Sequence, residues 1–194
     1  MKTLALTMTI LASEMIASAQ NVAGLPPSPV VRPVTIQHVT VTSRRDFAAT
    51  IREFEKQIGT FDPAALKPLG EPNPDFEQIK AKVEAMAGSS GFMRFGGINK
   101  FGDLVTLAGQ PAGKANRYVI GNPLIALQMV RHKLGVGLYV PLSILISEDD
   151  GGVTHLEYDL PSSLLDQFDH PEVRKVALML DQKLSALLSS SAGL

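Results

Sequence analysis

The sequence predicts an α+β fold, a two-layer domain in which helices pack on an antiparallel sheet of about five strands. Two observations favour this class. Runs of β-branched residues alternate with segments of helical periodicity, and a clear β-hairpin pattern lies late in the chain. The expected element order is β-α-[α insertion]-β-β-α-β-β-α. A length of 194 residues favours one domain, which can bury a core without metals or disulfides.

The composition excludes several classes of function. The chain has 18 Lys and Arg against 19 Asp and Glu, and its basic runs, such as Arg131-His132-Lys133, are at most three residues long. Nucleic-acid binding requires a concentrated basic surface, so we do not expect a nucleic-acid partner. Cysteine is absent, which excludes disulfides, thiolate nucleophiles and cysteine-based metal sites.

Residues 1–19 have the pattern of a secretory signal peptide. Lys2 precedes an apolar stretch from Leu4 to Ala12, and Ala17-Ser18-Ala19 provides a cleavage site. The alternative is an amphipathic first helix, which fits less well because the stretch has no polar face. We therefore expect an exported protein, periplasmic or secreted, that begins at Gln20 and keeps no membrane anchor.

The rest of the chain divides into a Pro-rich linker at 20–33, a domain at 34–188 and a flexible tail at 189–194. The domain should begin with a strand at Thr35–Thr42 and a helix that Ser43 caps and Gly59 ends.

A second helix is predicted to open at Asn73-Pro74, with Asn73 as its cap and Pro74 in the first helical position. Its apolar face comprises Phe76, Ile79, Val83 and Met86.

The later elements have clearer signals. Residues 91–108 contain two short strands around a Gly-rich bend, and the last helix begins at Asp169-His170-Pro171. The hairpin turns at Asp149-Asp150-Gly151-Gly152, which suits positive φ, and Pro141 should lie at a strand edge or bulge.

The turn Gly121-Asn122-Pro123 joins a predicted strand, Tyr118 to Ile120, to a predicted helix that runs from Pro123 to about Lys133. We favour a structural interpretation, in which Asn122 caps the helix and Pro123 takes its first position. The alternative is a binding site, because the N–H groups at a helix N-terminus can hold an anion.

An ordered set of motifs resembles a known family. The motifs are G-F-M-R-F at 91–95, Y-V-I-G-N-P at 118–123, V-P-L-S-I-L-I-S-E-D-D-G-G at 140–152 and L-E-Y-D-L-P at 156–161. Together they are similar to the family called domain of unknown function 302, with residues 60–90 as an insertion. The resemblance implies a compact α+β domain with an antiparallel sheet, often a homodimer, and no established activity.

The chain departs from that family's pattern at two places. It has Asn99-Lys100 where many members have an Asp-His pair, and Ala126-Leu127 where they have Gly-Thr. A metal or acid–base role at the Asp-His position therefore cannot be transferred to this chain.

No catalytic motif, cofactor motif or metal motif is apparent. The four histidines (His38, His132, His155 and His170) lack the spacing that places two imidazoles on one metal. We therefore expect no cofactor, no metal and no assignable catalytic residue.

Two hypotheses remain. The first is a small-molecule-binding or homodimeric interaction module without catalytic activity, whose ligand is apolar or anionic. Its candidate binding residues are Arg117, Asn122, His132, Glu148 and Tyr158. The alternative is a hydrolase- or isomerase-like enzyme that uses Glu148, His132 and Tyr158 as acid–base residues.

Overall fold

The computed structural model describes residues 29–194. The predicted signal peptide, 1–19, and most of the predicted linker lie outside the described residues. Residues 29–33 contain no helix or strand, and Val34–Leu194 forms one unit. Within residues 29–194, none of the helices has both the length and the apolar character that crossing a membrane requires.

One mixed, mostly antiparallel sheet forms a layer of this unit. Its order is β1-β7-β6-β5-β3-β2, with β4 paired to β5 beside this path. All pairs are antiparallel except β2 with β3. The strands are β1 (His38–Thr42), β2 (Gly59–Thr60), β3 (Met93–Arg94), β4 (Asn99–Lys100), β5 (Ala115–Gly121), β6 (Leu142–Glu148) and β7 (Thr154–Asp159). The α+β class is confirmed, with seven strands where about five were expected.

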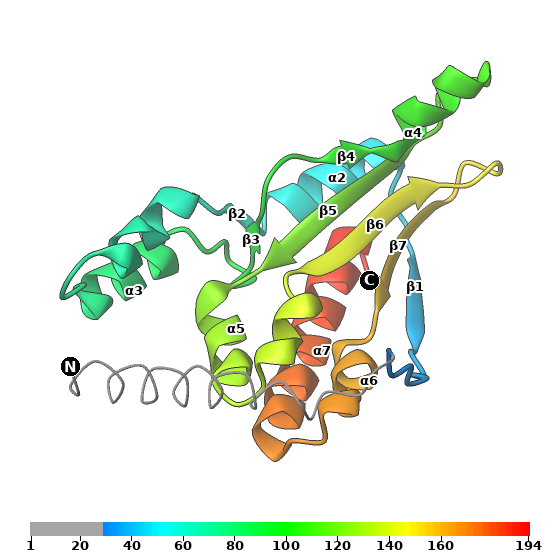
Figure 1. The fold of residues 1–194 in the computed structure, drawn as a ribbon. Coiled ribbons are helices and arrows are strands. Elements are labelled where there is room, and N and C mark those ends of the chain that lie inside the picture. The colour runs from blue at the N-terminus through cyan, green and yellow to red at the C-terminus, as the bar shows by residue number, and fades with distance from the viewer. Residues whose placement is uncertain (1–28) are drawn as a thin grey trace, which may run out of the picture. The chain divides into compact units, whose positions relative to one another are not determined.

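The helices of Val34–Leu194 vary in length, and α7 is the longest (Figure 1). The α-helices are α2 (Phe47–Glu55), α3 (Phe76–Ala85), α4 (Phe101–Leu104), α5 (Pro123–Val130), α6 (Pro161–Leu165) and α7 (Pro171–Ala192). The 3₁₀ segments are η2 (Pro63–Gly70), η3 (Val105–Ala108), η4 (Leu134–Leu138) and η5 (Asp166–Phe168). Residues 101–108, which were expected to belong to a strand after the Gly-rich bend, are helical and form α4 and η3.

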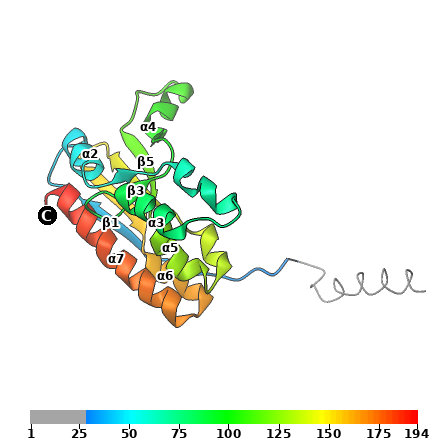
Figure 2. The ribbon, with the colours of Figure 1, turned by 90° about the vertical axis from the view of Figure 1, so that its left-hand side faces the viewer.

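The main core lies between α2, α5, α7 and one face of the sheet (Figure 2). Alternate residues of the strands point to this face, as the period of two requires. Ile144 and Ile146 of β6, Leu156 of β7 and Leu184 of α7 are among its buried side chains. The intervening strand residues point to the other face, where they are half-buried or exposed.

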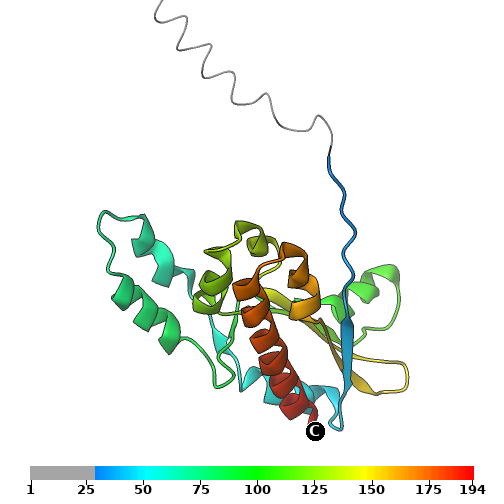
Figure 3. The ribbon, with the colours of Figure 1, turned by 90° about the horizontal axis from the view of Figure 1, so that it is seen from below.

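Residues 60–90, which were predicted to be an insertion, lie at the end of the sheet formed by β3 and β2, far from β1 (Figure 3). It contains η2 and α3, which pack on each other, and α3 also contacts α5. Ile79 and Val83 of α3 are buried as predicted, whereas Phe76, expected on the same apolar face, is 64% exposed.

The two ends of this segment meet in close backbone contact. The N–H groups of Gly59 and Gly88 both donate to the carbonyl oxygen of Phe92, at 2.9 and 3.0 Å. A Cβ on Gly59 would lie 1.7 Å from the carbonyl oxygen of Met86, a distance that no packed atom pair can adopt. Glycine is therefore required here by the close approach of two main chains.

Two predicted helix starts were wrong by a few residues. The N-cap of α2 is Asp46, whose side chain accepts a hydrogen bond from the N–H of Ala49, and not Ser43. The N-cap of α3 is Asp75, and not Asn73. In both cases an aspartate closer to the helix serves as the acceptor, and aspartate caps as well as serine or asparagine does.

The predicted flexible tail at 189–194 is also wrong, because α7 continues to Ala192. Ser191 and Ala192 are buried. The Arg45 guanidinium donates to the carbonyl oxygens of Ser190 and Ser191 at 2.6 and 2.8 Å. A cation that binds the last carbonyls stabilises the C-terminal end of a helix.

Candidate functional site

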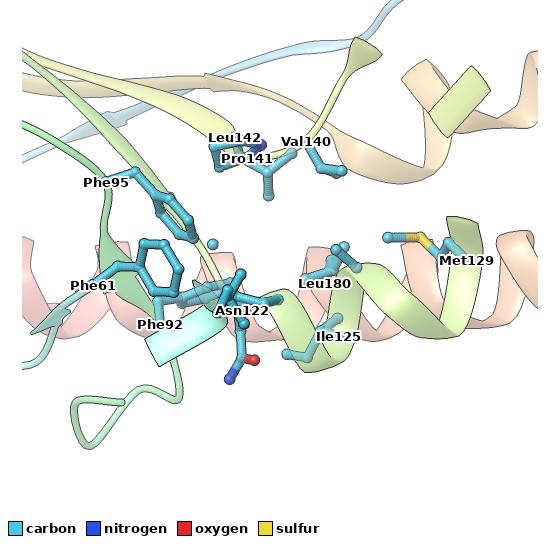
Figure 4. Close-up of a pocket in the computed structure, with 14 residues that line it drawn as sticks. Phe61, Phe92, Phe95, Asn122, Ile125, Met129, Val140, Pro141, Leu142 and Leu180 are labelled. Atoms are coloured by element: carbon cyan, nitrogen blue, oxygen red, sulfur yellow. The ribbon is translucent and has the colours of Figure 1, made fainter. Parts of the chain in front are cut away.

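A predominantly apolar pocket of about 200 Å³ lies where β5 ends and α5 begins (Figure 4). Four parts of the chain line it: the 60–95 region, the turn with α5, the approach to β6, and α7. The lining residues are Phe61, Leu66, Phe92, Phe95, Gly121, Asn122, Pro123, Ile125, Ala126, Met129, Val140, Pro141, Leu142 and Leu180. None of these side chains carries a charge, and Asn122 is the polar one among them.

The turn at the pocket is built as the capping pattern predicts. Asn122 Oδ1 accepts a hydrogen bond from the N–H of Leu124 at 2.9 Å, and Pro123 takes the first helical position. Asn122 Nδ2 donates to the carbonyl oxygen of Gly91 at 3.0 Å, which ties the turn to the segment before β3. Both ends of the amide are therefore occupied, and the structural interpretation of Asn122 is confirmed.

Phenylalanine rings and a proline form opposite walls of the pocket (Figure 4). The rings of Phe61 and Phe95 stack with their centroids 4.4 Å apart. A Cβ on Gly121 would lie 3.0 Å from Pro141 Cβ and 3.5 Å from Phe95 Cε2. The missing side chain of Gly121 therefore keeps a narrow space between a ring and a proline. Pro141 follows a cis peptide bond and immediately precedes β6.

The five predicted binding residues do not form one site, although Arg117 and Tyr158 both line a second hollow on the sheet. Asn122 lines the pocket, but Arg117 lies on β5 and donates to the hydroxyl of Ser143 at 2.8 Å, on the sheet face away from the main core. His132 is exposed beyond the end of α5, with its ring stacked on His170 at 4.8 Å between centroids.

The other two predicted residues have structural contacts of their own. Glu148, near the hairpin turn, forms an ion pair with Lys114 at 2.7 Å. Tyr158 is 5% exposed on the core face of β7, and burial raises the pKa of its phenol, with a further contribution from Asp181.

The acid–base set of the enzyme hypothesis, Glu148, His132 and Tyr158, is therefore dispersed. Glu148 lies at the hairpin end of β6, whereas His132 follows α5 near the opposite end of that strand (Figure 1). Catalysis needs these groups within hydrogen-bond reach of one reacting atom, and this arrangement does not provide it.

A polar cluster on the outer face of the sheet was missed by the sequence analysis, which considered His38 alone. His38 Nδ1 lies 3.0 Å from Asp159 Oδ1, and its Nε2 lies 3.5 Å from Glu157 Oε1. The hydrogen bond with Asp159, followed by that with Glu157, raises the pKa of His38 above its ordinary value of 6.5. The signal was the register of β1 and β7, which pairs His38 with Asp159 and is not local in sequence.

We expect Asp159→Asn to lower the pKa of His38 back toward 6.5, because the largest favourable partner of the imidazolium is removed. The raised pKa in the folded state means that this pairing stabilises the protein below about pH 6.5. The contribution is lost as pH rises through the folded pKa of His38. Titration of the His38 ring protons by NMR measures the shift, with Asp150→Asn as the control that leaves it in place.

A second polar group lies on the core face beside α2. The phenol of Tyr118 donates to the Glu55 carboxylate at 2.8 Å, and burial, followed by this hydrogen bond, raises the pKa of Tyr118 well above 10. The cluster keeps Tyr118 protonated as a hydrogen-bond donor. Among residues 29–194, no group of three or more His, Cys, Asp or Glu side chains could hold a metal ion.

Fold and pocket together define a class of protein, an α+β domain whose helices pack on an antiparallel sheet and enclose an apolar pocket at a strand-to-helix turn. The family described as "Domain of unknown function DUF302" matches residues 71–191. The chain belongs to this family, as its motifs predicted. The match includes residues 71–90, part of the segment assigned to an insertion, whereas Phe61 and Leu66 of the pocket lie before it.

A solved structure has the same fold. The crystal structure of an uncharacterized conserved DUF302 protein from Bacillus stearothermophilus is similar with a TM-score of 0.55 and 17% sequence identity. The similarity covers 79% of this chain and 97% of that one. No curated protein matches the chain.

Proposed function

We propose that this protein is a binding module that holds a small, largely apolar molecule in the pocket beside the Gly121-Asn122-Pro123 turn. The observation that carries the proposal is a space of about 200 Å³ whose 14 lining residues include one polar side chain, Asn122, which is hydrogen-bonded to Leu124 and Gly91. A concave apolar site of this kind is the usual form of a small-ligand site. The lining supplies no titratable group, which supports binding rather than catalysis.

The matched variants Ala126→Phe and Leu127→Phe test this proposal. Ala126 lines the pocket, whereas its neighbour Leu127 is 54% exposed and lies outside the lining. We expect a ring at 126 to fill the pocket and to abolish the rise in melting temperature that benzene produces in the wild-type protein, because only binding to the folded state stabilises it. Leu127→Phe should keep that rise.

Native mass spectrometry of the protein as purified complements the melting experiment. We expect an added small mass on the wild type and on Leu127→Phe, and none on Ala126→Phe. Wild-type protein that carries no added mass and gains no thermal stability from benzene contradicts the proposal.

We also propose that the protein forms a homodimer through the outer face of its sheet. The supporting observation is one row across three strands, in which Arg117 of β5 pairs with Leu145 of β6 and Leu145 pairs with Glu157 of β7. Arg117 and Glu157 therefore lie on opposite sides of Leu145, each one strand spacing, about 4.8 Å, away from it. In such a dimer the outer faces of two sheets would face each other, related by a two-fold axis that runs parallel to β6. This rotation exchanges the two sides of β6, so each Arg117 would lie opposite the Glu157 of the other copy.

Charge reversal tests the dimer. Arg117→Glu and Glu157→Arg should each shift the protein toward monomer, because each places like charges opposite each other across the interface. The double variant restores opposite charges and should recover the dimer. Light scattering coupled to size-exclusion chromatography measures the mass of each. A monomeric wild type, or a double variant no better than the single ones, rejects this interface.

A further inference from the structure

We infer that the ligand of the pocket is a neutral, single-ring aromatic compound with at most a short apolar substituent. This inference rests on the proposed binding function and adds the chemical class of the ligand. The absence of charge, the size of the space and the shape of its walls each contribute one part of it.

The charge state follows from the hydrogen bonds of the lining. Asn122 is the one polar side chain of the lining, and its amide already donates to Gly91 and accepts from Leu124. The N-terminus of α5 offers an anion little, because Pro123 has no N–H and the next donors already have Asn122 as acceptor. An ionised ligand would lose its hydration and meet no opposite charge here, which disfavours the anionic alternative.

The size follows from the volume. A dry apolar cavity of about 150 Å³ lined by Leu, Ile and Phe is large enough to hold benzene. The present pocket, at about 200 Å³, has room for one ring with a substituent of a few carbon atoms.

The shape follows from the walls. The stacked pair Phe61 and Phe95 forms one side, and Gly121 leaves a slot between Phe95 and Pro141 that a Cβ would fill. A flat ring can enter such a slot and meet the phenylalanine rings in offset or edge-to-face geometry, whereas a puckered saturated ring of similar size is thicker. Phe61, one of the two stacked rings, precedes the part of the chain that matches the family.

Calorimetric titration of the full chain with four compounds of matched size tests the class. These are ethylbenzene, ethylcyclohexane, phenylacetate and 2-phenylethylammonium. We expect ethylbenzene to bind tightest, with ethylcyclohexane roughly five- to tenfold weaker. The two ions should bind at least about 100-fold more weakly than ethylbenzene, because neither meets an opposite charge in the lining.

Phe61→Leu keeps the wall apolar but removes one ring, so it should bring the affinities of ethylbenzene and ethylcyclohexane close together. Phe101→Leu, at a ring that is 44% exposed and outside this pocket, is the matched control and should leave their ratio unchanged.

The outcomes separate the two proposals. If none of the four compounds binds the wild type, the binding function itself is rejected. If ethylcyclohexane or an ion binds as well as ethylbenzene, the pocket still binds small molecules but the aromatic, neutral class is overturned. If Phe61→Leu leaves the ratio of the ethylbenzene and ethylcyclohexane affinities unchanged, the ring of Phe61 does not select for aromatic ligands.

Discussion

Gly59→Ala should lower the free energy of unfolding by about 3 kcal/mol or more, because overlap with a main chain is not relieved by a change of rotamer. The new Cβ would overlap the carbonyl oxygen of Met86 and crowd the amide nitrogen of Gly88. The two ends of the 60–90 segment must then separate, and the shared hydrogen bonds to Phe92 weaken. Urea denaturation followed by circular dichroism measures the loss.

Gly137→Ala is the matched control. Gly137 is exposed, and a Cβ there would meet no atom within 4 Å. It should change the free energy of unfolding by less than about 1 kcal/mol. We also expect Gly59→Ala to become sensitive to proteases within residues 60–87 and to lose its response to benzene, since Phe61 is no longer held in place. An unfolding curve like that of the wild type would show that the two main chains move apart at little cost.

Phe92→Ala should destabilise the protein by about 3–5 kcal/mol, the usual range for a fully buried phenylalanine. Phe92 is 0% exposed, belongs to the main core and also lines the pocket, and Lys183 Nζ lies 5.6 Å from the centre of its ring. Removing the ring leaves a cavity joined to the pocket, so ethylbenzene should restore part of the lost stability. Thermal and urea denaturation, with and without the compound, measure both effects.

Phe76→Ala is the same substitution at a ring that is 64% exposed. It should cost less than about 1 kcal/mol and gain nothing specific from ethylbenzene. Equal losses in the two variants would mean that Phe92 does not contribute to the core as its burial indicates.

Elements with strong local signals were predictable. The hairpin of β6 and β7 has alternating apolar residues around a Gly-Gly turn, and α5 has an Asn-Pro start. The family resemblance was also sound, and three of its four motifs lie in the hairpin or lead directly into α5. The two-residue strand β2 could not be predicted, since its pairing with β3 defines it and its own composition does not.

The pocket was only partly predictable. Asn122 was identified at its edge, and correctly interpreted as a cap. Phe61 and Phe95 lie outside regular periodic segments, so no pattern marks them as neighbours before the chain folds. The other proposed binding residues were chosen for their polar chemistry, whereas the pocket excludes such chemistry almost completely.

The arrangement at Phe92 also affects how this chain can vary through evolution. The carbonyl group of Phe92 accepts a hydrogen bond from each end of the 60–90 segment, and the pairing of β2 with β3 and the contact of α3 with α5 attach the segment further. Between Gly59 and Gly88, residues can be gained, lost or exchanged without shifting the register of β5, β6 and β7. Substitutions at Phe61 and Leu66 therefore alter the pocket, and with it the choice of ligand, while the pairing of the main strands stays the same.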